Sequence, residues 1–460
     1  MRIGRTLPPA AALLDWRDLG HAVVAMWSPD RTVQVREDEI KKHFGVPYAC
    51  LVSSGTAALT LALIALRDLS ERTDVIIPAF TCYSVPAAVL AAGLRPVLCD
   101  VEPSTFDYDH ARLQQTLSDN TLCVVAHHLF GVPADIERLR ALCHARGIFL
   151  VEDAAQAMGI KVDGEYVGTK GDVGIFSFGR GKNVTSGSGG VIIAQRNSIA
   201  EALDRRCGCL EDPSRIQVWA ELFRSMVMTA FIRPSLYWFP AAMPFLRLGE
   251  TIYPRKVALH RLSGMQAGLL HGWRERLHQS NQIRSENATD LTLRLSLNPP
   301  RGQSHPYLRL PLLAPTPREK KRIFEMSRKQ GLGMSVAYPA TINEVPELKG
   351  HFDGGRYPGA TKLAQQLLTI PTHHWVEERD RKALTNCLAT TMRAAPPTPT
   401  QDERRTSSVE PVKVPALERS AADLAGRSLL ARSARPEPLS GPPRVESSRS
   451  EPHSSPIHHG

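Results

Sequence analysis

Between residues 46 and 196, short apolar segments alternate with segments of helical pattern, and this alternation narrows the possible folds more than any other feature. The apolar segments are rich in valine, isoleucine and leucine and lie at 74–80, 95–101, 122–130 and 148–154. The helical patterns between them lie at 83–92, 107–117 and 133–146. Strands buried on both faces have this composition, and their alternation with helices is typical of βαβ units. The sequence therefore predicts an α/β fold with three layers, α/β/α, around a mostly parallel sheet.

Two further apolar segments, 172–178 and 189–195, follow closely and predict a strand pair with a tight connection. Residues 256–395 have a more mixed pattern, which predicts a smaller α+β domain. Its helical segments lie at 263–290, 317–330 and 358–367, and its strand-like segments at 307–313 and 333–339. The predicted divisions are an N-terminal segment at 1–45, a large domain at 46–220, an insertion at 221–255, the small domain at 256–395 and a tail at 396–460.

The tail, residues 396–460, differs in composition from the rest of the chain. It contains 11 of the 35 prolines and no phenylalanine, tryptophan or tyrosine. A segment of this kind buries too little apolar surface to offset the entropy lost on ordering. We therefore expect the tail to be disordered, either as a tolerated extension or as an interaction segment.

Residues 221–248 are apolar and aromatic, yet they carry Arg224, Arg233, Arg247 and three prolines. Charge and proline together exclude a simple transmembrane helix. Two interpretations remain open. The segment is either a dimer or interdomain contact, or a membrane-touching hairpin with basic flanks that would make this a peripheral membrane protein.

Charge and cysteine content exclude several classes of protein. The net charge is +10, but the basic residues are spread along the chain, so we expect small anionic partners and no nucleic acid. The eight cysteines show no disulfide or zinc spacing, and His373-His374 lack further metal ligands at a suitable spacing, so we expect no metal site. The apolar run near the start is too short for a signal peptide. These features predict a cytoplasmic protein.

The segment FSFGRGKNVTSGSGG, residues 176–190, places Lys182 among five glycines. A phosphate-binding P-loop would need a glycine at Phe176 and a serine or threonine at Asn183, so that motif fails. A solvated lysine would need neither the glycines nor the apolar strand before it. A lysine that forms a Schiff base needs both, because its amine must lose charge readily and its small neighbours must leave room for a flat cofactor.

Two other segments carry groups that such a lysine would need. Ser54-Gly55-Thr56 begins a predicted helix, where free amide groups form an anion site, although an ordinary N-cap is an alternative. Asp153 ends a buried strand, at the edge of the sheet where α/β proteins bind ligands. Its charge there needs a cation, such as a protonated ring nitrogen. The preceding Glu152 is better interpreted as a solvated acid, because side chains alternate at a strand end.

Several short motifs follow one another in the order found in one known family. They are SSGTAAL, IPAFT, PVLCDVEPSTFDYD, HLFGVPADI, VEDAAQA, GDVGIFSF, GKN…GSGGVI, RLSGMQAGLL, YPATINEVPELKGHF and LLTIPTHHW. Together they resemble the DegT/DnrJ/EryC1/StrS aminotransferases, which are fold-type I pyridoxal phosphate enzymes of the sugar aminotransferase kind. The resemblance covers roughly residues 30–392, and the ordered set is far more specific than any single motif.

The resemblance implies roles for individual residues. Lys182 matches the lysine that forms the Schiff base with the cofactor and then shuttles a proton between substrate and cofactor. Asp153 matches the aspartate that pairs with the pyridinium nitrogen. The other matches are cofactor ligands, namely Gln156 beside the ring and Gly55, Thr56 and Ser177 at the phosphate.

The chain departs from the family at three places. Cys82 occupies the position where an aromatic residue usually stacks on the cofactor, so we predict that the adjacent Tyr83 takes this role. The sequence GSGG at 187–190 replaces the common GEGG. Residues 257–260 lack the asparagine that reaches the cofactor phosphate of the partner subunit.

The resemblance implies an aminotransferase and a homodimer with active sites at the subunit interface. The expected amino donor is glutamate, and the expected acceptor is a keto sugar on a nucleotide, in polysaccharide or secondary-metabolite synthesis. Two alternatives stay open. One is another pyridoxal phosphate reaction on a lipid-linked or non-sugar substrate, which the insertion and the missing asparagine favour. The other is a non-enzymatic sensor or scaffold with the same fold.

Overall fold

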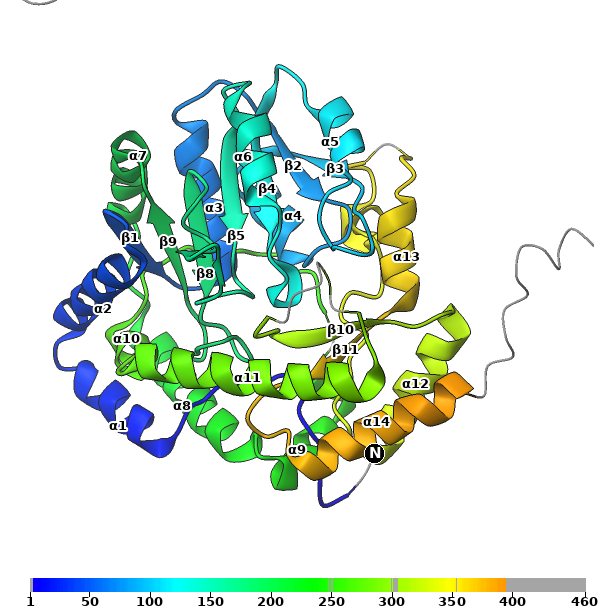
Figure 1. Cartoon of the computed structure of the whole chain (residues 1–460). Helices are drawn as coiled ribbons and strands as arrows, with labels where there is room; N and C mark the ends of the chain where they lie inside the picture. Colours follow the sequence, from blue (N-terminus) through cyan, green and yellow to red (C-terminus); the bar gives the residue numbers. More distant parts are fainter. Residues whose placement is uncertain are drawn as a thin grey trace, which may run out of the picture. The chain divides into compact units, whose positions relative to one another are not determined.

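The computed structural model describes residues 3–246, 248–249, 251–298, 300, 305–352 and 354–393. These residues belong to one compact unit, shown in Figure 1. The predicted tail at 396–460 and the predicted flanking Arg247 lie outside the described residues. The domain boundaries predicted within the unit stay predictions.

The centre of the unit is a seven-stranded sheet with the order β1-β9-β8-β5-β4-β2-β3. Its strands are β1 (Tyr48–Val52), β2 (Asp74–Pro78), β3 (Arg95–Cys99), β4 (Thr121–His127), β5 (Phe149–Asp153), β8 (Val173–Ser177) and β9 (Gly190–Ala194). The five strands from β8 to β3 run parallel, whereas β9 pairs antiparallel with both β8 and β1. The prediction of a mostly parallel sheet is confirmed. A separate short hairpin joins β6 (Lys161–Val162) to β7 (Glu165–Tyr166).

Helices cover both faces of this sheet, because successive side chains of a strand point to opposite faces. In β2, Val75 and Ile77 belong to one buried cluster, whereas Ile76 between them belongs to another. The helices from this part of the chain that contribute to the first cluster are α3 (Gly55–Arg67), α4 (Ser84–Ala91) and α7 (Asn197–Gly208). Those that supply the second are α5 (His110–Thr116) and α6 (Ile136–His144). The predicted three-layer architecture is therefore present (Figure 1).

A smaller group of helices surrounds a second, two-stranded sheet in which β10 and β11 pair antiparallel. Its elements are α10 (Gly264–Leu269), α11 (Trp273–Leu295), β10 (Arg309–Leu313), α12 (Pro317–Gln330), η4 (Ile342–Glu344), η5 (Pro346–Leu348), α13 (Pro358–Gln366), β11 (Leu367–Pro371) and α14 (Glu378–Arg393). The single helix predicted at 263–290 is two helices, because Gly272 adopts a left-handed conformation with φ 64°. The strand-like segment predicted at 333–339 makes only one bridge, from Ser335 to Thr369, because Ala337 leaves the extended region with φ 53°.

The N-terminal residues before α1 (Trp16–Ala25) and α2 (Pro29–Phe44) thread between distant parts of the chain. Leu7 N–H donates to the carbonyl of Gly331 at 2.9 Å, and Thr6 N–H donates to the carbonyl of Pro234 at 2.9 Å. Further contacts join Arg5 to Asp380, Pro8 to His373 and Ala11 to Arg284. The first residues of the chain thus connect the small domain to the predicted insertion.

The predicted insertion, 221–255, contains α9 (Pro234–Ala241), the short helix η2 (Pro244–Leu246) and most of α8 (Arg215–Phe231), which begins six residues before it. One side of α8 packs on the molecule, where Leu222 joins a cluster with Leu19 and Met265. Large apolar residues are exposed on all three helices, namely Ile216, Trp219 and Phe223 on α8, Leu236 and Phe239 on α9, and Phe245 in η2. In the described part of the chain, no helix combines the length and the apolar character that crossing a membrane requires.

Candidate active site

The carboxyl ends of the parallel strands bring several predicted site residues to one edge of the sheet. β5 ends at Asp153 and β8 ends at Ser177. The last residue of β4, His127, lies opposite Asp153 in the sheet. Lys182 follows β8 and lies near enough to Asp153 for the carboxylate to affect its pKa. Ligands of open α/β sheets bind at this edge.

The Lys182 loop, residues 178–189, joins β8 to β9 and is longer than the tight connection predicted from the sequence. Phe178 N–H donates to the carbonyl of Gly189 at 2.8 Å, and Ser186 N–H donates to the carbonyl of Phe178 at 3.0 Å. The loop therefore folds back onto its own base. These two hydrogen bonds hold the ends of the loop together, and they position the backbone from which the Lys182 side chain extends.

Two glycines of this loop are required by the backbone and by close packing. Gly181 and Gly187 have φ angles of 78° and 80°, which residues other than glycine rarely adopt. A Cβ at Gly181 would lie 2.8 Å from Cβ of Ala10, and a Cβ at Gly187 would lie 2.7 Å from Oγ of Ser225. These two glycines make room for other segments of the chain, not for a cofactor ring as the sequence suggested.

The amine of Lys182 lies in a setting that disfavours its charge. Burial is the main cause that lowers the pKa of Lys182, and the positive charge of Arg309 lowers it further. Cys82 and Asp153 act in the opposite direction, but the pKa still falls below the usual 10.5. A larger fraction of this amine is therefore neutral and nucleophilic at neutral pH than for a solvated lysine.

The start of α3 lies directly against Ser177. Ser54 caps the helix by accepting a hydrogen bond from Ala57 N–H at 3.0 Å. A Cβ at Gly55 would lie 2.8 Å from Cβ and 3.0 Å from Oγ of Ser177, so only glycine fits there. The cap coexists with an anion site, because the first amides of a helix, here of Gly55 and Thr56, have no intrahelical partner. The predicted phosphate ligands are brought together.

Asp153 and Gln156 are held differently. A carboxylate oxygen of Asp153 accepts one hydrogen bond, from Ala155 N–H at 3.1 Å, and the residue is only half-buried. The side-chain oxygen of Gln156 accepts from Phe130 N–H at 3.1 Å, and its nitrogen donates to the hydroxyl of Tyr338 at 3.0 Å. Gln156 is thus fixed in orientation, whereas Asp153 keeps acceptor capacity for a ligand.

The prediction that Glu152 is a solvated acid is wrong. Its side chain is fully buried, because β5 is covered on both faces. It accepts hydrogen bonds from the amides of Gly168 and Lys170 at 2.8 and 2.7 Å and contacts Nε2 of His128 at 3.0 Å. Burial raises the pKa of Glu152, but His128 and the amides outweigh it, so the net shift is downward.

Tyr83, the predicted stacking residue, is the N-cap of α4. Its hydroxyl accepts from Ala340 N–H at 3.1 Å and donates to the carbonyl of the same residue at 3.3 Å. Its ring centroid lies 6.1 Å from that of Tyr338. Cys82 is the neighbour that acts on the pKa of Lys182. The stacking role of Tyr83 stays a prediction.

Sequence reasoning missed two residues of the site, Tyr338 and Arg309. Tyr338 lies in the segment between α12 and η4, where its hydroxyl meets Gln156 and its ring stacks on Phe130 with centroids 6.0 Å apart. Arg309 begins β10 and affects the pKa of Lys182. Both are far from Lys182 in sequence. Tyr338 is the first residue of the motif YPATINEVPELKGHF, to which no ligand role was assigned, and Arg309 stands in none of the family motifs.

The residues at this edge fit the chemical groups of pyridoxal phosphate. The Gly55–Ser177 cradle offers amides and a hydroxyl to a phosphate, and the open side of Asp153 offers a carboxylate to a ring nitrogen. The amine of Lys182, with its lowered pKa, suits condensation with a carbonyl carbon. Within the described ranges, no cluster of three or more His, Cys, Asp or Glu side chains could hold a metal ion.

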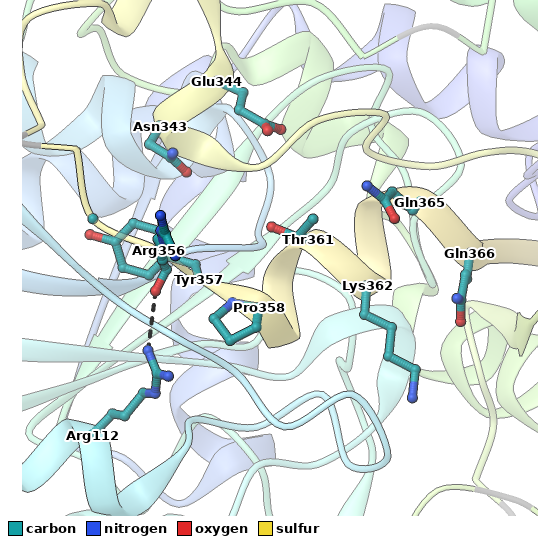
Figure 2. A pocket seen from close by; sticks show the side chains of 11 residues that line it. Arg112, Asn343, Glu344, Arg356, Tyr357, Pro358, Thr361, Lys362, Gln365 and Gln366 are labelled. Carbon is teal, nitrogen blue, oxygen red and sulfur yellow. Dashed lines mark hydrogen bonds between the residues drawn. The ribbon is translucent and has the colours of Figure 1, made fainter. Parts of the chain in front are cut away.

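A cavity of about 610 Å³ lies apart from these residues, between α5 and α13. Figure 2 shows Arg112 from α5 donating to the carbonyl of Arg356, at 3.1 Å, beside Thr361 and Lys362 of α13. The first amides of α13, those of Gly359 and Ala360, are taken by Asp100 at 2.9 and 2.8 Å. Because these polar groups bind one another, we interpret the cavity as a packing junction between α5 and α13.

Residues 25–389 match the DegT/DnrJ/EryC1/StrS aminotransferase family. Among curated proteins, the chain is similar to the GDP-perosamine synthase of Escherichia coli O157:H7, with 35% identity over 167 residues. That match covers 36% of this chain and 46% of the synthase. The chain thus spans about half the length of the first curated relatives that it matches.

Solved structures share the fold over most of the chain. The aminotransferase PseC of Helicobacter pylori superposes with a TM-score of 0.69 and 18% identity, covering 85% of this chain and 100% of that one. Spr1654 from Streptococcus pneumoniae, in its PLP form, gives a TM-score of 0.67 with 18% identity over 84% of this chain and 99% of that one. At these identities the likeness establishes the fold.

Proposed function

This chain belongs to the DegT/DnrJ/EryC1/StrS aminotransferase family, and we propose that it is a pyridoxal phosphate-dependent transaminase. The observation that carries the proposal is the amine of Lys182, which has a lowered pKa and lies beside Asp153 at the carboxyl edge of the sheet. The PLP form of the structural neighbour Spr1654 supports the choice of cofactor.

Pyridoxal phosphate, when bound, supplies an electrophilic carbonyl carbon and a ring that withdraws electrons. Asp153 would keep a proton on the ring nitrogen through a charged hydrogen bond. The amides of Gly55 and Thr56 and the hydroxyl of Ser177 would hold the phosphate. Gln156 would orient the ring, because Phe130 and Tyr338 fix its amide.

Lys182 would carry out two steps with one atom. Its Nζ would hold the cofactor through the carbonyl group, which burial favours by lowering the pKa of the amine. The same Nζ, when not engaged with the cofactor, would serve as the base that moves a proton at the substrate carbon bearing the amine. Both roles need a lysine whose backbone is held in place, and the hydrogen bonds at the base of the Lys182 loop support this.

We propose glutamate as the amino donor and a nucleotide-linked keto sugar as the acceptor, in polysaccharide or secondary-metabolite synthesis. The similarity to a GDP-perosamine synthase supports an acceptor of this kind. A lipid-linked or non-sugar acceptor is the second candidate, because the helices at 215–246 expose apolar side chains next to basic ones. A sensor that binds the cofactor without turnover is the third.

A half-reaction tests the function. L-glutamate is added to the purified holoenzyme, and the cofactor absorbance and released 2-oxoglutarate are followed. We expect one equivalent of 2-oxoglutarate and loss of the cofactor band. Lys182→Ala should show neither, and Lys321→Ala, an exposed lysine of α12, should behave as the wild type. A stable band with no donor reaction would favour the sensor, and no band would overturn every function that uses the cofactor.

We also propose a cytoplasmic homodimer in which the exposed apolar side of α8, α9 and η2 is a contact surface. A hollow of about 470 Å³ adjoins α8, lined in part by Met26, Val218 and Trp219. Peripheral contact with an anionic membrane through 221–248 is the competing interpretation. Trp219→Ser with Phe223→Ser should yield monomers in light scattering if the surface is a dimer contact. If dimers persist and binding to anionic vesicles falls instead, the membrane interpretation holds.

A further inference from the structure

Arg309 is a half-buried cation, and the described residues leave its Nε without an acceptor. Its Nε is inaccessible to solvent and makes no hydrogen bond to any described residue. None of the described carboxylates forms an ion pair with it. The groups near enough to affect its pKa are Tyr338, Cys82 and Tyr237, and none of them is a carboxylate. Arg309 therefore brings an uncompensated positive charge to the side of Lys182.

Another arginine, the buried Arg284 of α11, shows that this fold can satisfy such a group. Its Nη1 donates to the carbonyl of Leu308 at 2.8 Å and to Oγ1 of Thr372 at 3.3 Å, and its Nη2 donates to the carbonyl of Ala11 at 2.6 Å. Leu308 is the residue immediately before Arg309. The unpartnered Nε is thus particular to Arg309, whose positive charge lies near enough to Lys182 to lower its pKa.

A partly buried charge without a partner is unfavourable, because it loses hydration and gains no counter-charge in exchange. A guanidinium hardly escapes this cost by losing its proton, because its pKa is so high. It presents planar N–H donors that match a carboxylate or a phosphate in a bidentate manner. The missing partner of Arg309 is therefore an anion that arrives from outside the chain.

The insertion contributes a second group to the same place. Tyr237 of α9 is close enough to Arg309 for each to affect the pKa of the other, and burial raises the pKa of Tyr237 to about 12. Its phenol is thus protonated and can donate a hydrogen bond. α9 is tied to the N-terminal segment through the bond from Thr6 N–H to the carbonyl of Pro234. The insertion thereby becomes part of the active site.

We propose that Arg309 and Tyr237 form a carboxylate-binding subsite beside Lys182 that takes the carboxylate on the reacting carbon of the amino donor. This inference rests on the proposed transaminase function. The reacting carbon must come within reach of Nζ of Lys182, and in an amino acid the carboxylate is attached to that carbon. In a nucleotide sugar the phosphates are attached at the sugar's anomeric position, away from the ketone. Proximity to Lys182 therefore favours a carboxylate over a phosphate.

Binding of a dicarboxylate that cannot react tests this subsite apart from turnover. Titration calorimetry of the holoenzyme with glutarate is compared for the wild type, Arg309→Gln, Arg309→Lys and Tyr237→Phe. Arg318→Gln, an exposed arginine of α12, is the matched control. Loss of hydrogen bonds to a charged group should weaken glutarate binding roughly 10- to 100-fold in Arg309→Gln. Tyr237→Phe should weaken it about threefold to tenfold.

Arg309→Lys should retain part of the affinity, because it keeps the charge and loses the planar fork. Equal glutarate binding by Arg309→Gln and Arg318→Gln, with the cofactor band intact in both, would overturn the proposal. So would a result in which inorganic phosphate, and not glutarate, depends on Arg309. Glutarate binding that depends on Arg309, without any glutamate half-reaction in the wild type, would instead uphold the subsite and reject the transaminase function.

Discussion

Two adjacent carboxylates, Glu152 and Asp153, lie on opposite sides of one strand and have opposite surroundings. Glu152 is buried, and its oxygens bind His128 and the amides of Gly168, Lys170 and Gly171. Asp153 is half-buried and accepts a single hydrogen bond from Ala155. The Glu152 cluster is complete within the protein, whereas the Asp153 side, with Lys182 and Arg309, is incomplete. Completeness indicates a structural role, and incompleteness indicates a place for a ligand.

Glu152→Gln is expected to have the largest effect on stability. The substitution puts an amide group where the carboxylate accepts hydrogen bonds, so amides and His128 lose a charged partner. We expect the free energy of unfolding to fall by about 3–5 kcal/mol. Urea unfolding followed by circular dichroism measures it. A loss below about 1 kcal/mol would mean that the buried cluster is not the structural element described here.

Asp153→Asn is expected to show the opposite pattern, with a small effect on stability and a large effect on the reaction. The carboxylate has one protein partner, so we expect the free energy of unfolding of the cofactor-free protein to change by less than about 1 kcal/mol. The half-reaction with glutamate should slow by about 100-fold or more, because a neutral amide cannot hold the proton on the ring nitrogen. Rapid-mixing absorbance gives the rate. Equal stability losses at 152 and 153 would remove the distinction between the two sides.

The pH dependence of stability should reveal the lowered pKa of Lys182, which lies on the Asp153 side of the strand. Its folded-state pKa lies below 10.5, so between that lowered value and 10.5 the unfolded chain binds more protons than the folded one. The free energy of unfolding from this residue therefore rises with pH through that window. Relative to Lys182→Met, the cofactor-free wild type should be more stable at about pH 10 than at about pH 8. A constant difference between the two proteins would contradict a lowered pKa.

The smallest effect on the half-reaction is expected at Tyr83. Tyr83→Phe removes the two hydrogen bonds to the backbone of Ala340 and keeps the ring. We expect a loss of about 1 kcal/mol in unfolding free energy and little change in the cofactor band. Tyr83→Ala should alter the band as well if the ring stacks on the cofactor. An unchanged band in Tyr83→Ala would reject the predicted stacking role.

The sequence was sufficient for the fold and for the ordered set of candidate residues around Lys182. Buried parallel strands can be recognised in a sequence because they are rich in apolar residues and alternate with helices. The ends of β2, β3, β5 and β8 lie within two residues of the predicted segments. The exception is β4, which ends three residues early, at His127. Glu152 was misjudged because both faces of a doubly covered strand are buried, so alternation at its end does not expose either side.

The site roles of Arg309 and Tyr237 could not be predicted from the sequence pattern around each residue. They stand 127 and 55 residues after Lys182, in a strand of the small domain and in the insertion, and only tertiary packing brings their charge and hydroxyl to the same place. Their signal is an unsatisfied hydrogen-bonding capacity, which exists only in the folded chain. The glycines at 181 and 187 were likewise given a cofactor role because Ala10 and Ser225, which they pack against, are distant in sequence.

The contacts of the first residues with distant parts of the chain also determine the order in which these contacts can form during synthesis. Arg5 meets Asp380, Pro8 meets His373, and Ala10 closes against Gly181 of the Lys182 loop. At about 5–20 residues per second, a ribosome needs roughly 20 to 75 seconds between making Arg5 and making Asp380. Gly181, Pro234 and Gly331 are made earlier, so the N-terminal segment gains its contacts in stages. The contacts with His373 and Asp380 form last, and the N-terminal segment is therefore fully held only after these residues have been made.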